Sequence, residues 1–556
     1  MSSQESDHKE PEITPQTTAA AELLFGLSFT QEEREQMQPA LNDQLEQLEK
    51  MRSIPLQNWD AMPLLFQPRT NDPVMADVPR IYQVGTREPV SRPENLEEAA
   101  FFSVAQLAEL VRSKQVSSVA LTEMYINRLK RYDPVLQCVV TLTEDLAIEQ
   151  ARRADKEIQQ GFYRGPLHGI PWGAKDLLAA RGYKTTWGAM PLKDQVIDMD
   201  ATVVSRLEQA GAVLVAKLTM GALALGDVWF GGVTKNPWDI TAGSGGSSAG
   251  PASATAAGLV GFSIGTETLG SIVNPSTRCG ISGLRPTFGR VSRHGAMALS
   301  WSMDKIGPMC RTAEDCALVL SAIYGPDGHD LTISPLPFTW NPALDPRRLR
   351  VGYVESAFAA AEQNLDEAET ALKSHKQLEV ENRQNSARVL DVLREQGFDL
   401  IPITLPDIEL RPLMMILLAE AAAAFDDLTR SDQDDLLTRQ DSEAFPNLFR
   451  VAHFISAVDY IQANRIRGQV MREMAAVMNQ IDVVVAPSFG GNVLMLSNLT
   501  GHPAVVLPNG FTDKHMPTSI TFIGGLYKEA EALAVARAYQ DATDFHLQYP
   551  QMDFGV

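Results

Sequence analysis

The sequence predicts an α/β protein with a mixed β-sheet whose two faces are covered by helices. Short, continuous apolar runs such as 212–216 and 483–486 predict strands that are buried on both faces. Amphipathic stretches such as 203–210 lie between such runs and predict the covering helices. The chain has 556 residues, 44% hydrophobic and 21% charged, which is enough for a large core.

The N-terminal hundred residues are expected to differ from the rest. Residues 1–18 are polar and contain proline, which predicts a disordered tail. Residues 19–100 are predicted to form a helical arm followed by a proline-rich linker, and a dimer contact is one use for such an arm. Its main helix should begin after Thr30, because Thr30 and Glu33 match a capping box. Pro39 should kink or split that helix.

A single large domain is predicted over residues 101–556. Its first helix should begin after Ser103, because Ser103 and Gln106 repeat the capping-box pattern. Segment 330–480 is more helical and more acidic in character, and we expect it to form a subregion that lines the substrate pocket.

The charge of the chain restricts its partners. It has 69 acidic and 48 basic residues, a formal charge of −21 and a pI of about 4.9. Such a field repels phosphate backbones and anionic lipids, so we expect neither a nucleic-acid nor a membrane partner. The N-terminus lacks the pattern of a secretory signal, and the most apolar stretch, 413–425, is too short to span a bilayer. A soluble, cytoplasmic protein is expected.

Most familiar enzyme signatures are absent. The four cysteines form no C-x-x-C pair, and the nine histidines form no zinc-binding pattern, so no metal and no cofactor are predicted. Residues 246–250 match G-x-S-x-G, but a Gly/Ser loop precedes them where a nucleophile elbow needs an apolar strand. We interpret this match as chance. A hydrolase of this composition needs a base other than histidine, and a buried lysine is the obvious candidate.

Three segments are unusual in combination. HGIPWGAKD at 168–176 places a lysine after a short apolar run, AGSGGSSAG at 242–250 is a loop of small residues and hydroxyls, and GTETLGSI at 265–272 places a serine after a turn. Loops of glycine and serine expose backbone N–H groups and let a ligand approach closely, as an oxyanion hole requires. Because the second loop runs directly into an apolar, helix-like stretch, a flexible linker is a poor explanation for it.

These segments resemble the amidase signature family. The stretch 236–295 carries its signature, NLTGHPAVVLPNG at 498–510 matches near the end, and the likeness runs from about 101 to 549. The resemblance implies a mixed sheet of about eleven strands and a Ser–cisSer–Lys triad. By position, Ser271 matches the nucleophile, Ser247 the bridging serine that follows a cis peptide bond, and Lys175 the general base.

The chemistry of such a triad is physically reasonable. A serine hydroxyl is a weak nucleophile, and neutral Lys175 can accept the Ser271 proton through the Ser247 hydroxyl, which both donates and accepts. For Lys175 to be neutral near pH 7–8, its pKa must fall by about 2–3 from the usual value, and burial supplies a cause. Without the other two segments, Lys175 would be better explained by a surface salt bridge, for example with Asp176.

The turn before the nucleophile is expected to form the oxyanion hole, from the backbone N–H groups of Thr268, Leu269, Gly270 and Ser271.

Four residues depart from the common family pattern. Leu269 stands where glycine is usual, Val273 where arginine is usual, Glu267 where aspartate is usual, and Pro251 where a small residue is usual. Leu269 is expected either to narrow the oxyanion turn or to reshape the pocket wall, and the changes at 267 and 273 must alter local ion pairing. None of them removes a member of the triad.

The favoured function is therefore a stand-alone amidase acting on a small-molecule amide, with esters and carbamates as further substrates by the same acyl-enzyme route. One alternative is the A-type component of a tRNA-dependent amidotransferase, in which the segment aligned with 219–226 typically carries an acidic pair. Gly221 and Ala222 stand there instead. A second alternative is a non-catalytic amide-binding protein, which Leu269 would explain.

The substrate pocket is predicted only loosely. Met220, Trp229 and Trp301 suggest a hydrophobic acyl or aryl group. For each of them taken alone, core packing is the stronger explanation.

Overall fold

The chain divides into two compact units. The computed structural model describes residues 13–55, 64, 82–85, 89–359 and 370–555. The larger unit combines 66–406 with 470–556, and the smaller unit combines 1–65 with 407–469. The candidate site lies in the larger unit.

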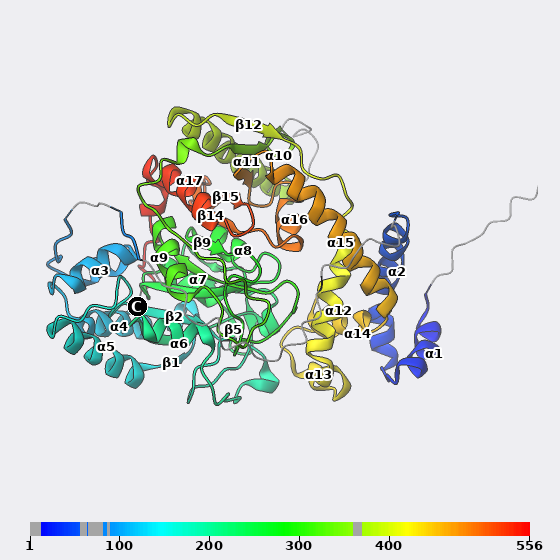
Figure 1. Ribbon diagram of the computed structural model, residues 1–556. Helices are drawn as coiled ribbons and strands as arrows, with labels where there is room; N and C mark the ends of the chain where they lie inside the picture. Colours follow the sequence, from blue (N-terminus) through cyan, green and yellow to red (C-terminus); the bar gives the residue numbers. More distant parts are fainter. Residues whose placement is uncertain (1–12, 56–63, 65–81, 86–88, 360–369, 556) are drawn as a thin grey trace, which may run out of the picture. The chain divides into compact units, whose positions relative to one another are not determined.

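The larger unit is built on one mixed sheet of eleven strands (Figure 1). Their order is β1-β3-β2-β8-β10-β9-β14-β15-β13-β11-β12. The strands are β1 (Val139–Leu142), β2 (Pro171–Lys175), β3 (Val213–Leu218), β8 (Phe262–Glu267), β9 (Ser282–Arg285), β10 (Lys305–Cys310), β11 (Val351–Val354), β12 (Leu400–Ile403), β13 (Val483–Pro487), β14 (Ala504–Phe511) and β15 (Pro517–Gly524). Because β2 runs parallel to β3 and β8 while β8 runs antiparallel to β10, the predicted mixed sheet of about eleven strands is confirmed.

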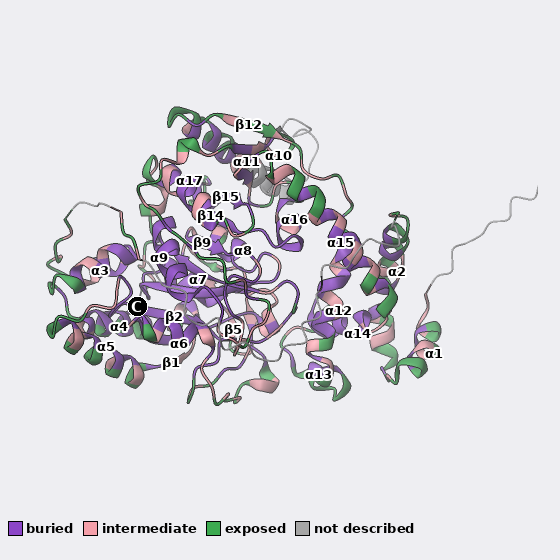
Figure 2. Ribbon diagram, viewed as in Figure 1, coloured by how far each residue is buried: buried purple, intermediate pink, exposed green. Residues whose placement is uncertain are grey.

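Helices flank this sheet. In Figure 1, α3 to α6 lie near the β1 end of the sheet, and α10 and α11 lie near the β12 end. The larger unit contains α3 (Val104–Arg112), α4 (Ser118–Leu136), α5 (Glu144–Gln159), α6 (Thr202–Gln209), α7 (Ala249–Ala256), α8 (Val273–Cys279), α9 (Ala313–Ile323), α10 (Glu355–Ala359), α11 (Thr370–Glu395), α16 (Val493–Leu499) and α17 (Glu529–Asp541). Every residue of α7 and α9 is buried, as the purple ribbons in Figure 2 show. Helix α7 packs on β2 and β8, which brings its N-terminal loop to the centre of the sheet.

The smaller unit is entirely helical among its described residues. It contains α1 (Pro15–Phe25), α2 (Gln31–Arg52), α12 (Met414–Ala424), α13 (Asp426–Arg430), α14 (Phe445–Ala452) and the first part of α15 (Ala457–Met478). Met37 and Leu41 of α2 are buried against Val451, and Arg52 pairs with Asp459 at 3.1 Å. Helix α2 therefore packs on part of segment 330–480, which was predicted to form a helical subregion.

Two expectations for the N-terminal region are corrected. Helix α1 begins at Pro15, inside the tail predicted to be disordered, because Thr14 caps it by accepting from the Thr17 N–H; residues 1–12 lie outside the described residues. Helix α2 runs as one element through Pro39, so the predicted split is wrong, while the predicted kink stays a prediction. Burial of the apolar face of the helix outweighs one lost hydrogen bond.

Both predicted capping boxes are present, at Thr30 with Glu33 and at Ser103 with Gln106. The domain boundary near residue 100 stays a prediction, because much of the linker lies outside the described residues. No helix in the described part of the chain is long and apolar enough to cross a membrane.

Candidate active site

Lys175 lies at the centre of the candidate site. It is the last residue of β2, and its side chain is fully buried. Its Nζ donates to Ser247 Oγ at 2.8 Å, to Ser248 Oγ at 3.1 Å and to Thr266 Oγ1 at 2.9 Å. No carboxylate in the described ranges forms an ion pair with this ammonium group. Three hydroxyl groups therefore surround a lysine that has no counter-ion.

This environment lowers the basicity of the lysine. Burial lowers the pKa of Lys175 to about 7, and the more distant charges of Asp304 and Glu267 oppose this shift only in part. Near pH 7 about half of the Lys175 side chains are then neutral. A neutral amine can accept a proton, as the triad chemistry requires.

Asp176 does not pair with Lys175. Its Oδ1 lies 2.9 Å from Nζ of Lys217, and both side chains are fully buried. The expected alternative, a surface salt bridge between Lys175 and Asp176, is wrong because consecutive residues at the end of a strand point to opposite faces of the sheet. Of these two neighbouring buried lysines, one has a carboxylate partner and the other has hydroxyls.

The loop between β7 (Asp239–Gly243) and α7 brings Ser247 to the lysine. The peptide bond between Gly246 and Ser247 is cis, as the family resemblance implies. A side chain at Gly246 would collide with the carbonyl oxygen of Gly226, 1.8 Å from its Cβ position. Only glycine fits at position 246. Close packing of the loop against the backbone of Gly226 is therefore a reason for the small residues in the loop.

Ser248, the central serine of the G-x-S-x-G match, has a structural position. It is fully buried, and its hydroxyl donates to the Thr266 carbonyl at 3.0 Å and accepts from the Thr266 N–H at 3.1 Å. These bonds tie the loop to β8. Ser248 and Thr266 were not predicted as partners of Lys175, although they lie in the segments 242–250 and 265–272 that the sequence singles out.

Ser271 lies beside this loop, in the turn between β8 and α8. Its backbone carbonyl accepts from the Ser248 N–H at 3.2 Å, so the two serine-bearing segments are in direct contact. Gly270, just before it, has φ +83°, a conformation that favours glycine. Ser271 keeps 9% of its surface exposed, and its hydroxyl has no hydrogen-bond partner among the described residues. An accessible, unengaged hydroxyl is what an attacking nucleophile needs.

The turn also offers backbone donors. The N–H groups of Thr268, Leu269, Gly270 and Ser271 have no hydrogen-bond acceptor in the part of the chain that the structure describes. Four free N–H groups in succession next to the serine are suited to an oxyanion.

The carboxylate of Glu267 bonds to the backbone of the two residues that follow Ser271. Its Oε2 accepts from the N–H groups of Ile272 and Val273 at 2.8 and 2.9 Å, while its Oε1 accepts from Arg285 at 2.7 Å and from Asn498 at 2.8 Å. Burial alone would raise the pKa of Glu267, but the Arg285 charge and these hydrogen bonds hold it at about 2. Glu267 is therefore ionised and fixes the turn that follows Ser271.

Arg285 and Asn498 were not predicted for the site. They come from β9 and α16, and Asn498 lies 231 residues from its carboxylate partner. Both lie in segments that carry the family resemblance, 236–295 and 498–510, and the expectation that glutamate at 267 alters the local ion pairing was a further signal.

Replacing Glu267 with alanine is expected to lower the free energy of unfolding by about 3–5 kcal/mol, because the fully buried Arg285 loses its counter-ion. Urea unfolding of the two proteins, followed by tryptophan fluorescence, measures this change. Glu109→Ala is the control, since the exposed pair of Glu109 with Arg112 contributes at most about 1 kcal/mol. A loss below about 1 kcal/mol for Glu267→Ala would contradict the assigned position of Glu267.

The three predicted substrate residues lie in different environments. Met220 is fully buried and Trp229 is 8% exposed, and Trp229 packs on Phe230 with ring centroids 4.8 Å apart. Trp301, by contrast, is 52% exposed and lines a cavity of about 390 Å³ that also touches Thr266 and Thr268. Of the three residues, Trp301 is the one that lines this cavity, which also contacts Thr266, a hydrogen-bond partner of Lys175.

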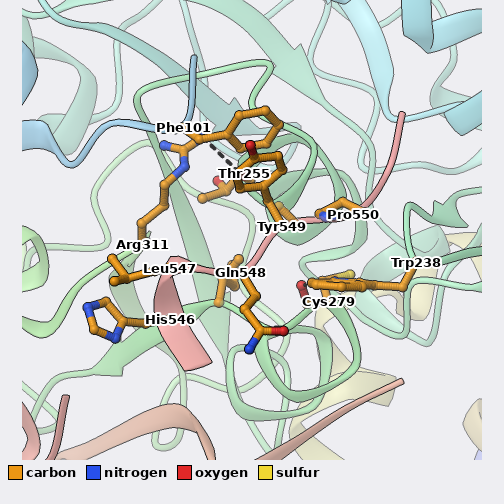
Figure 3. Close-up of a pocket in the computed structure, with 13 residues that line it drawn as sticks. Phe101, Trp238, Thr255, Cys279, Arg311, His546, Leu547, Gln548, Tyr549 and Pro550 are labelled. Atoms are coloured by element: carbon orange, nitrogen blue, oxygen red, sulfur yellow. Dashed lines mark hydrogen bonds between the residues drawn. The ribbon is translucent and has the colours of Figure 1, made fainter. Parts of the chain in front are cut away.

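A second cavity, shown in Figure 3, is too small for a substrate. It encloses about 20 Å³, room for about one water molecule, beneath the C-terminal residues 546–550. Tyr549 stacks on Phe101 at 4.0 Å, and Arg311 donates to the Thr255 carbonyl at 2.9 Å. Of these two contacts, the stacking of Tyr549 on Phe101 holds the C-terminal segment against the rest of the unit.

Comparison with known proteins identifies the fold and the family. The model of the Amidase family matches residues 120–496, more than half of the chain. The chain belongs to the amidase family. Its structure is similar to the X-ray structure of the native peptide amidase from Stenotrophomonas maltophilia, with a TM-score of 0.69 and 28% identity over 82% of this chain and all of that one.

Two amidase-family relatives are similar over most of their length. The A-type component of the glutamyl-tRNA(Gln) amidotransferase from Methylococcus capsulatus is 34% identical in an alignment 494 positions long, which covers 81% of this chain and 98% of the relative. The protein of the same name from Coxiella burnetii is 33% identical in an alignment 499 positions long, which covers 81% of this chain and 99% of the relative. Each alignment leaves about a fifth of this amidase-family chain uncovered.

Proposed function

We propose that this protein hydrolyses carboxylic amides through a serine acyl-enzyme. Ser271 acts as the nucleophile, Ser247 as the bridging hydroxyl and Lys175 as the general base. The observation that carries the proposal is the buried Lys175, which has a pKa of about 7, donates to Ser247 at 2.8 Å and has no carboxylate partner among the described residues.

We infer the acylation step from the Lys175–Ser247 hydrogen bond and from the position of Ser271 beside the loop that carries Ser247. Ser271 Oγ forms a bond to the amide carbonyl carbon while its proton passes to Ser247, whose own proton passes to Lys175 Nζ. The carbonyl oxygen becomes an oxyanion within reach of the free N–H groups of residues 268–271. When the C–N bond breaks, the nitrogen receives the proton back along the same path and leaves as ammonia or an amine.

Deacylation repeats the steps with water. A water oxygen bonds to the acyl carbon and gives its proton through Ser247 to Lys175. The bond from carbon to Ser271 Oγ breaks, Oγ takes the proton, and the carboxylic acid departs. Esters and carbamates form the same type of acyl-enzyme, so the proposal includes them as substrates.

The rate should depend on pH through Lys175. With a neutral amide substrate, kcat/KM is expected to rise about tenfold per pH unit below pH 6 and to level off above about pH 8. The sign follows from the base, because the ammonium form that prevails below the pKa of about 7 cannot accept a proton. Initial rates between pH 5 and 9, with circular dichroism as the folding control, measure the profile. A flat profile, or one that falls with rising pH, would contradict the proposal.

The proposed activity is tested by incubating the purified chain with primary amides, anilides and carbamates and measuring the released ammonia, amine and acid. Hydrolysis by the isolated chain that is lost in Ser271→Ala supports a stand-alone amidase. No hydrolysis of any substrate by a folded chain contradicts it.

A second candidate is the A-type component of a glutamyl-tRNA(Gln) amidotransferase. The sequence relatives named above support this candidate more than the first, because both carry that name and align over nearly their full length. Gly221 and Ala222 count against it, since an acidic pair is typical of that segment in such proteins. Glutamine hydrolysis that appears only after partner proteins are added would favour this candidate.

A further inference from the structure

The cavity of about 390 Å³ lies next to the candidate site, although its lining includes none of the three triad residues. It lies against Thr266, whose Oγ1 accepts from Lys175 Nζ, and against Thr268 in the oxyanion turn. Its volume lies within the range of small-molecule sites in proteins. All of its lining residues belong to the larger unit.

The polar groups of the cavity are largely engaged with one another. Thr268 Oγ1 donates to Asp304 at 2.5 Å, and Arg293 pairs with Asp330 at 3.0 Å. Asp304 also accepts from the N–H groups of Leu299 and Ser300 at 2.8 and 3.0 Å, and burial raises the pKa of this carboxyl. These pairings leave little attraction for a charged ligand.

The walls are flat and aromatic. Trp301 exposes 52% of its surface, and the rings of His294 and His329 stack with centroids 4.3 Å apart and planes 19° apart. Met297 and Leu177 add apolar surface. Flat aromatic walls beside the polar groups of Thr268 and Asp304 suit a planar ring that carries one polar atom.

We propose that this cavity binds the leaving amine and selects arylamines over ammonia. The inference rests on the proposed function, because the leaving nitrogen must collect its proton from Ser247 and Lys175 and so must lie on the Lys175 side of Ser271. The cavity reaches this region through Thr266, whose side chain contacts Lys175. Trp301 and the stacked pair of His294 and His329 then hold the aromatic ring of the amine.

The first test compares two substrates with the same acyl group, a 4-nitroanilide and the primary amide. Both give the same acyl-enzyme, so a difference in kcat/KM reports on the amine side alone. Trp301→Ala is expected to lower the ratio of anilide to amide kcat/KM by about tenfold, as lost ring contact implies. Phe162→Ala, which removes a similarly exposed ring (57%) elsewhere in the unit, should keep the ratio. An unchanged ratio in Trp301→Ala overturns the inference.

The second test needs no catalysis. Equilibrium dialysis of 4-nitroaniline against Ser271→Ala should show one saturable site that the added Trp301→Ala change weakens about tenfold and the added Phe162→Ala change does not. Absence of saturable binding, or equal binding by all variants, overturns the inference even if the chain hydrolyses amides. Binding at this site by a chain that hydrolyses no amide would contradict the proposed function and support the cavity as an arylamine site.

Discussion

Ser271→Ala is expected to lower kcat for amide hydrolysis by at least about 10⁴-fold while the fold is kept. The alanine cannot form the acyl-enzyme, so only the free N–H groups and substrate binding remain to assist attack by water. The Ser271 hydroxyl makes no hydrogen bond among the described residues, so its loss removes no structural contact. Steady-state kinetics and the melting temperature of the two proteins measure both effects.

Ser276→Ala is the matched control for this variant. Ser276 lies five residues later in α8, is fully buried, and its hydroxyl has no hydrogen-bond partner among the described residues. Its replacement should leave kcat close to that of the wild type. Equal rates for wild type and Ser271→Ala would rule out Ser271 as the nucleophile.

Lys175→Met is expected to lower kcat/KM by about 10³–10⁴-fold, because the Ser247 hydroxyl loses the only base within hydrogen-bonding distance in the described chain. Methionine is apolar and of similar length, so it should fill the buried space. The stability at pH 7 should fall by no more than about 1 kcal/mol, since the lysine is already partly neutral and has no ionic partner among the described residues.

Lys217→Met gives the contrasting result. Lys217 is buried to the same degree but pairs with Asp176 at 2.9 Å, so its loss leaves a buried carboxylate without a counter-ion. This variant should lose about 3–5 kcal/mol of folding stability. Urea unfolding of both variants separates a lysine that acts as a base from one that stabilises the fold. Equal loss of stability in the two would contradict this distinction.

Several helices and strands in both units were predictable from local sequence. Capping boxes at Thr30 and Ser103 and the apolar runs at 212–216 and 483–486 mark helices and strands where the structure has them. The reason is that capping and burial patterns act over a few residues. The contact between the segments that carry Lys175 and Ser247 was also predictable. The family resemblance linked these two motifs, which hydrophobic periodicity alone does not connect.

Long-range pairings could not be predicted in this way. A charged residue reveals that it needs a partner but not which one, so the bonds of Glu267 with Arg285 and Asn498 were missed. Asp176 was assigned to its sequence neighbour, although the geometry of a strand gives it to Lys217. Likewise, the sequence of α2 does not reveal its packing partner, and only the structure shows that Val451 packs against Met37 and Leu41.

Intact-mass analysis after treatment with a serine-directed fluorophosphonate tests the central claim most directly. We expect one adduct on the wild type, none on Ser271→Ala, and strongly slowed labelling of Lys175→Met, because the nucleophile needs its base. An adduct that persists in Ser271→Ala would contradict a nucleophilic Ser271. No adduct on a folded wild type would contradict it as well, and would favour a protein that binds amides without cleaving them.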